Sequence, residues 1–177
     1  MHSFLQSGVM SLPNYTRAQE LPALLQQRIA ILDGAMGTMI QRFKLGEAQY
    51  RGAGYTGADA AGDRFTEFAY DVKGNNELLS ITRPDVIRDI HEKYLAAGAD
   101  LIETTSFGAG SVAQEDYHLA DLARERNRKC VQLARAACDK YSVNGRKCYV
   151  AGALGPTPKT ASISPDVNDP CARNVDF

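Results

Sequence analysis

Acidic, hydroxyl and glycine residues directly follow short apolar runs at three places in this chain. The runs end near Leu32, Ile102 and Leu154. In parallel α/β folds, the carboxyl ends of the strands carry the chemistry, so we expect the residues that follow these runs to meet at one edge of a sheet. The candidate site residues are Asp33, Gly34, Glu103, Thr104, Gly155 and Thr157.

Each candidate residue has a possible role in ligand binding and a simpler structural role. Asp33 can bind the ammonium group of a ligand, and Gly34 lets a ligand approach the backbone; alternatively, Asp33 only caps a turn. Glu103 can bind an amine or brace the rim of the sheet, while the hydroxyl of Thr104 can bind a ligand carboxylate. The segment with Gly155 and Thr157 can offer backbone N–H groups to an anion, or it is a rigid turn.

Other kinds of catalytic site find no support in the sequence. The glycines at 34 and 37 fit neither phosphate-binding glycine pattern and indicate a tight turn. No histidine is paired with a nucleophile and an orienting acid, and we predict that His91 is solvated near the polar face of a helix. Cys130 and Cys138 are predicted to be small core residues, and the four cysteines form no zinc or redox motif.

The composition restricts the partners of the chain. Of its 177 residues, 44% are hydrophobic and 23% charged, and the net charge is -1, which argues against nucleic acid and anionic membranes as partners. The sequence has no apolar run of roughly 18 residues and no secretory leader pattern at its start. We therefore expect a cytoplasmic protein.

Three strands and two long helical regions are predicted to position the candidate residues. The strands cover residues 29–32, 100–104 and 148–154. The first helix is expected at 84–97, with Thr82 as its cap, and the second region at 111–141, with a break near His118. Residues 1–27 are interpreted as an extension, 46–80 as a long and functional or mobile loop, and 155–177 as a loop-like tail.

The alternation of strands and helices favours an α/β fold with a parallel sheet. Three strands do not close a barrel, and a complete (β/α)₈ domain takes about 250 residues. We therefore predict a partial TIM barrel over residues 28–177, made of about the first three βα units.

Four sequence runs resemble the N-terminal, homocysteine-binding module of the cobalamin-dependent methionine synthase family (5-methyltetrahydrofolate–homocysteine S-methyltransferases). They are LDGAMGTMIQ, KGNNELLSITRPDVI, AGADLIETTSF and VAGALGPTPKTASISPDVNDP, beginning at residues 32, 73, 97 and 150. The resemblance implies a (β/α)₈ barrel in which zinc activates the homocysteine thiol for attack on methylcobalamin, with methyltetrahydrofolate as the later methyl source. It also implies that Asp33 and Gly34 contact the substrate, and that Glu103, Thr104, Gly155 and Thr157 occupy rim positions.

The sequence departs from that family in two respects. Thr105 and Ser106 stand where Asn-Thr is usual, and Ala35 stands where glycine is common. The family's zinc cysteines lie in later strands and include a G-G-C-C motif, which has no counterpart here, so we assign no metal-binding and no catalytic residue. We expect the chain to be a fragment that lacks turnover by itself. Two alternatives stay open: a cobalamin-independent homocysteine methyltransferase that uses betaine or S-methylmethionine, and a non-catalytic truncated product.

Overall fold

The structure is a computed structural model that describes residues 18–157, 159 and 164–173. The chain divides into two units, Met1–Ala30 and Ile31–Phe177. In the first unit, a 3₁₀ turn, η1 (Ala18–Glu20), leads into α1 (Leu21–Gln27), which has Pro22 in its first turn and no buried residue. The predicted extension up to residue 27 stays a prediction, and the predicted lack of a secretory leader concerns residues 1–15, which lie outside the described residues.

The sheet of the second unit is smaller than predicted. Its strands are β1 (Leu101–Glu103) and β2 (Tyr149–Ala151), which pair in parallel with Leu101 opposite Tyr149. The predicted strand at 29–32 is wrong, because only Leu32 forms an isolated parallel bridge, to Leu101. The Asp100 carboxylate accepts a hydrogen bond from the N–H of Ile31 at 2.9 Å. This N–H therefore bonds to a side chain and not to the backbone of a neighbouring strand. The described part of the chain is thus mixed α/β and mostly helical, with two parallel strands.

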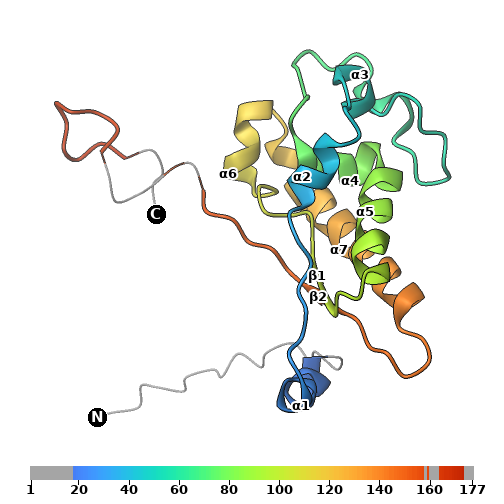
Figure 1. Ribbon diagram of the computed structural model, residues 1–177. Helices are drawn as coiled ribbons and strands as arrows, with labels where there is room; N and C mark the ends of the chain where they lie inside the picture. Colours follow the sequence, from blue (N-terminus) through green and yellow to red (C-terminus); the bar gives the residue numbers. More distant parts are fainter. Residues whose placement is uncertain (1–17, 158, 160–163, 174–177) are drawn as a thin grey trace, which may run out of the picture. The chain divides into compact units, whose positions relative to one another are not determined.

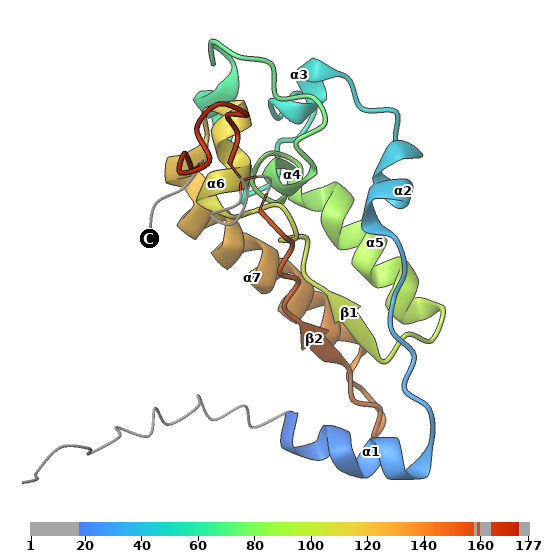
Figure 2. The same ribbon diagram turned by 90° about the vertical axis from the view of Figure 1, so that its left-hand side faces the viewer.

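Two long helices pack side by side against this small sheet (Figures 1 and 2). They are α5 (Pro84–Ala96) and α7 (Ala123–Tyr141). The predicted helix at 84–97 is confirmed, since α5 starts at the predicted residue and ends one residue earlier. The second predicted region breaks as expected, since His118 has φ 56°. Before α7 lie α6 (Ser111–Gln114), η4 (Glu115–Tyr117) and η5 (Ala120–Leu122). No helix among the described residues is both long and apolar enough to cross a membrane.

The predicted cap of α5 is wrong. Arg83 occupies the N-cap position, and Thr82 ends the preceding helix, α4 (Leu79–Thr82), where its hydroxyl donates to the carbonyl of Leu78. This hydroxyl is committed inside α4 because that short helix runs almost directly into α5, a connection that the capping pattern alone does not reveal.

His91 is buried, contrary to the prediction. It is fully inaccessible, and neither ring nitrogen has a hydrogen-bond partner among the described residues. The buried face of α5 is wide because the helix contacts α2 (Met36–Gln41), α4, α7 and β1. His91 lies four residues after Ile87 and four before Leu95, which are both buried, so the helical period places it on that face.

The segment 46–80 is organised, not an open loop. It contains α3 (Glu47–Tyr50), η2 (Gly62–Phe65) and η3 (Asn76–Leu78) before α4. The Arg51 guanidinium donates to the carbonyls of Phe65, Phe68 and Tyr70, at 2.7 to 3.0 Å. Glu47 bonds to Arg51 at 2.6 Å and accepts from two backbone N–H groups, at Val72 and Lys73. These bonds close the segment on itself and hold its apolar residues in the core.

Two clusters of buried apolar side chains form the core of the second unit. The larger lies where 46–80 meets α4, α5 and α7, and the smaller lies between β1, β2, α5 and α7. Cys138 belongs to the smaller cluster, and Cys130 is also fully buried, which confirms their predicted core positions. In the tail, the described residues after Gly155 form no helix or named strand; residues 158, 160–163 and 174–177 lie outside the described part.

Candidate functional site

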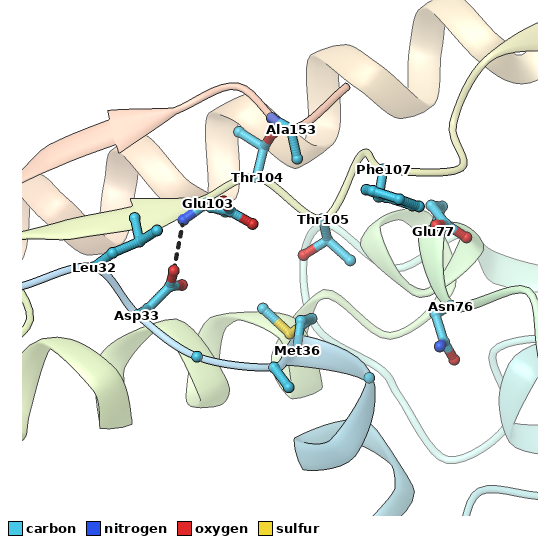
Figure 3. A pocket seen from close by; sticks show the side chains of 13 residues that line it. Leu32, Asp33, Met36, Asn76, Glu77, Glu103, Thr104, Thr105, Phe107 and Ala153 are labelled. Carbon is cyan, nitrogen blue, oxygen red and sulfur yellow. Dashed lines mark hydrogen bonds between the residues drawn. The ribbon is translucent and has the colours of Figure 1, made fainter. Parts of the chain in front are cut away.

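A pocket of about 490 Å³ opens beyond the end of β1, where the chain turns from Leu32 into α2. Its wall comes from four separate segments: the turn before α2, η3, the end of β1, and the chain after β2. Figure 3 shows these side chains around the opening. The lining residues are Leu32, Asp33, Gly34, Ala35, Met36, Gly37, Asn76, Glu77, Glu103, Thr104, Thr105, Phe107 and Ala153.

Asp33 is held against the end of β1 by two hydrogen bonds to the main chain of that strand. Its N–H donates to the carbonyl of Leu101 at 2.9 Å, and its Oδ1 accepts the N–H of Glu103 at 3.1 Å (Figure 3). Burial raises the pKa of the Asp33 carboxyl to about 6, and the charge of nearby Glu103 adds to this rise. At neutral pH the carboxylate is therefore ionised but incompletely solvated, and it faces a second carboxylate. A cation bound between the two relieves both penalties.

Thr104 lines the pocket, but its hydroxyl is already engaged. The hydroxyl lies 2.7 Å from that of Ser106 and accepts the N–H of Ala153 at 3.0 Å. Ser106 in turn donates to the carbonyl of Ala153 at 2.8 Å. These bonds fasten the end of β1 to the chain after β2, so Thr104 shapes the rim and has no free hydroxyl proton for a ligand.

Two of the six candidate residues lie outside the lining of this pocket. The N–H of Gly155 donates to the carbonyl of Phe107 at 3.0 Å, and a Cβ at position 155 would lie only 2.4 Å from that oxygen. Glycine is thus required here by a close approach of two backbones. The hydroxyl of Thr157 donates to the carbonyl of Lys159 at 2.6 Å. The structure therefore brings Asp33, Gly34, Glu103 and Thr104 together and places the other two elsewhere.

Sequence reasoning missed the pocket residues that come from η3. Asn76 accepts a hydrogen bond from the Tyr50 hydroxyl at 2.7 Å, and Glu77 accepts the N–H of Gly108 at 2.9 Å. The signal that could have found them is the polar run at residues 73–77, which lies between two fully buried apolar residues, Val72 and Leu78. A polar run in such a position indicates side chains held at a defined place near the core, not a solvated loop.

The described residues do not fit the zinc site that the resemblance implies. Among them, no group of three His, Cys, Asp or Glu side chains lies close enough together to hold a metal ion. Cys130 donates to the carbonyl of Thr105 at 2.8 Å, and burial raises the pKa of its thiol to about 11. Cys138 and Cys148 are buried as well, whereas Cys171 is exposed in the tail.

Comparison with known proteins identifies the family. The sequence profile of the homocysteine S-methyltransferase family matches residues 30–176. The chain belongs to this family. Membership covers all four segments that build the pocket, and it agrees with the family-level part of the sequence resemblance. It does not distinguish a methionine synthase from other homocysteine S-methyltransferases.

Solved structures of a homocysteine methyltransferase are similar to this chain. The oxidized form of MmuM from Escherichia coli is 27% identical, with a TM-score of 0.55, over 77% of this chain and 40% of that one. Its metallated form is 26% identical, with the same TM-score, over 77% and 41%. The chain thus spans about 40% of the length of these homocysteine methyltransferases.

Proposed function

We propose that this chain forms the substrate-binding part of a homocysteine S-methyltransferase and that its pocket holds the amino-acid end of homocysteine. The observation that carries this proposal is the pair of carboxylates at the end of β1. Asp33 and Glu103 face the same pocket, and burial together with the charge of Glu103 raises the pKa of Asp33 to about 6. An ammonium group between them is the natural counter-charge.

The pocket also suits the remainder of an amino acid. Gly34, Ala35 and Gly37 add little side-chain bulk to the wall, which leaves their backbone open to a ligand. Met36 and Phe107 supply apolar and polarisable surface for the methylene groups and the sulfur. The residues described here bind and orient homocysteine; formation of the thiolate needs a metal site that they do not contain.

Within the family, we propose that the chain belongs to the cobalamin-dependent methionine synthase branch. The supporting features are the runs KGNNELL, at residue 73, and SISPDVNDP, at residue 162. In that branch, methylcobalamin and methyltetrahydrofolate are the methyl sources and zinc is the resident metal. A cobalamin-independent enzyme shares the Asp33–Gly34 feature and is the alternative.

The first test is the binding of L-homocysteine to the 177-residue chain by isothermal titration calorimetry under reducing conditions. We expect binding at pH 7 that becomes about tenfold weaker at pH 5, because only about a tenth of a carboxyl with a pKa near 6 is ionised there. Affinity falls as the pH falls, since the protonated carboxyl no longer attracts the ammonium group. The ligand's own ammonium and carboxylate keep their charges between these two values.

Circular dichroism at both values establishes that the chain is folded in each titration. L-Homoserine, which has the same ammonium and carboxylate groups, serves as a probe for the pocket's amino-acid end. An absence of homocysteine binding at pH 7 by the folded chain contradicts the proposed function. An affinity that does not change with pH contradicts the assigned role of Asp33.

A second test concerns turnover. We expect the purified chain, supplied with zinc, homocysteine and methylcobalamin, to form no methionine above the uncatalysed background, because the described residues provide no metal site for the thiol. Mass spectrometry of the product is the measurement, with buffer lacking protein as the reference. Methionine formed in proportion to the amount of chain would refute the expectation.

A further inference from the structure

Thr105 carries a buried hydroxyl that has no partner in the described structure. The residue is only 7% exposed, and its Oγ1 makes no hydrogen bond. A buried hydroxyl without a partner is costly to folding, and such groups are rare in native proteins. Since Thr105 lines the pocket, the missing partner can come from a ligand.

The contrast with its neighbours shows that this is a local property of Thr105. Residues 104, 105 and 106 all carry hydroxyls at the end of β1. Those of Thr104 and Ser106 bond to each other and to the backbone of Ala153, so both are satisfied. Only the hydroxyl between them in sequence is left over, and Figure 3 shows it on the side of the residue that faces Asp33 and Met36.

The main chain of Thr105 is held in place by a contact with α7. Its carbonyl accepts a hydrogen bond from the buried thiol of Cys130 at 2.8 Å, and that thiol lies 3.1 Å from the hydroxyl of Ser80. These contacts with α7 and α4 fix the position of the Thr105 backbone, from which the side chain projects at the pocket wall. A preorganised donor of this kind gains affinity because little ordering is needed on binding.

The carboxylate of an amino acid needs hydrogen-bond donors in this pocket. No lysine or arginine belongs to the lining, and the two carboxylates at the end of β1 repel a negative group. The side-chain donors left in the lining are the hydroxyl of Thr105 and the amide nitrogen of Asn76. The Asn76 oxygen already accepts from Tyr50, which directs its nitrogen away from that bond.

We propose that Thr105 donates a hydrogen bond to the α-carboxylate of the amino-acid substrate and so fixes its orientation relative to Asp33. This inference rests on the proposed function. The ammonium group binds at Asp33 and Glu103, and the carboxylate lies toward Thr105 and Asn76. Because the two charged groups have separate partners, the pocket distinguishes a complete α-amino acid from an amine or an acid alone.

The test compares Thr105→Val, which has the same shape without the hydroxyl, with Thr105→Ser, which keeps the hydroxyl. Two ligands are titrated: L-homocysteine, and 3-aminopropanethiol, which has the thiol and ammonium groups but no carboxylate. We expect Thr105→Val to bind homocysteine about tenfold more weakly, as for loss of one hydrogen bond to a charged group, and 3-aminopropanethiol with unchanged affinity. Thr105→Ser should retain most of the homocysteine affinity.

Thermal unfolding supplies a readout that separates binding from packing. Loss of the orphaned hydroxyl should leave the unfolding midpoint of Thr105→Val equal to or above that of the unaltered chain. Homocysteine affinity that is the same in Thr105→Val and the unaltered chain overturns the inference, as does an equal loss for both ligands. If the unaltered chain binds no homocysteine, the proposed function fails as well; if it binds and only the Thr105→Val effect is missing, this inference alone fails.

Discussion

Replacing Asp33 with asparagine is expected to weaken homocysteine binding on the order of 100-fold while leaving the fold intact. Asparagine has the same shape and can still accept the N–H of Glu103, so the local geometry is kept. What is lost is the negative charge that faces the ammonium group. Removing one member of a partly desolvated charge pair typically costs about 2–5 kcal/mol, which corresponds to a loss of this size.

The same substitution should not lower stability. The pKa of Asp33 is raised in the folded chain, to about 6, so the folded state binds the proton more tightly than the unfolded state does. The ionised carboxylate therefore opposes folding above that pH, and the neutral amide removes this penalty. We expect the unfolding midpoint of Asp33→Asn at pH 7.5 to equal or exceed that of the unaltered chain.

Two controls make the Asp33 experiment specific. Asp71→Asn removes the same charge from an exposed position outside the pocket lining and should bind homocysteine normally. The ligand 4-sulfanylbutanoate, which lacks the amine, should bind Asp33→Asn at least as tightly as the unaltered chain, because it loses no ammonium contact and meets one negative charge fewer. Equal homocysteine affinity of Asp33→Asn and the unaltered chain would exclude Asp33 as the ammonium partner.

The second large effect concerns His91 and the stability of the fold in acid. Burial lowers the pKa of His91 to about 4, and desolvation is its only cause. The unfolded chain binds the proton near pH 6.5, so between about 6.5 and 4 the unfolded state holds more protons than the folded state. Stability is therefore lost as the pH falls through this window, by about 2 kcal/mol between pH 7 and pH 5.

His91→Leu should remove this part of the acid sensitivity. The measurement is the free energy of unfolding by urea at pH 7 and pH 5, for the unaltered chain and the variant. The stability difference in favour of His91→Leu should grow by about 2 kcal/mol at the lower pH; the contribution of Asp33 is common to both chains and cancels. Leu95→Met, a volume-conserving change one turn later, should keep the acid sensitivity of the unaltered chain. A difference that stays constant with pH would show that His91 is not held neutral by burial.

The long helices were predictable because their information is local. In α5, proline at the first position and apolar residues at spacings of three and four predict both the start and the buried face. The break at His118 was also predictable as a disruption of period. The prediction that His91 is solvated is wrong because it follows the polarity of the residue, whereas the helical spacing places His91 on the same buried face as Ile87 and Leu95.

The prediction of a strand at residues 29–32 is wrong because strand pairing depends on residues far away in the sequence. An apolar run before Asp33 indicates a buried strand, but pairing depends on partners far along the chain. Here the hydrogen bonds to residues 31–33 come from the Asp100 side chain as well as from the backbones of Asp100, Leu101 and Glu103, and only a single bridge forms. Likewise, Arg51 organises the segment 46–80 through carbonyls up to Tyr70, which no periodicity encodes.

By itself, the sequence determined the family, the two long helices and the position of Glu103 and Thr104 at the end of a strand, because motif order and helical period are written in short stretches of chain. Only the tertiary structure decided which of the candidate residues share a pocket. It also decided that the Thr104 hydroxyl is hydrogen-bonded to Ser106 and Ala153, and that Gly155 lies close to the backbone of Phe107. The Thr105 hydroxyl, by contrast, has no partner among the described residues. Those outcomes depend on hydrogen bonds between segments tens of residues apart, and such bonds exist only once the chain has folded.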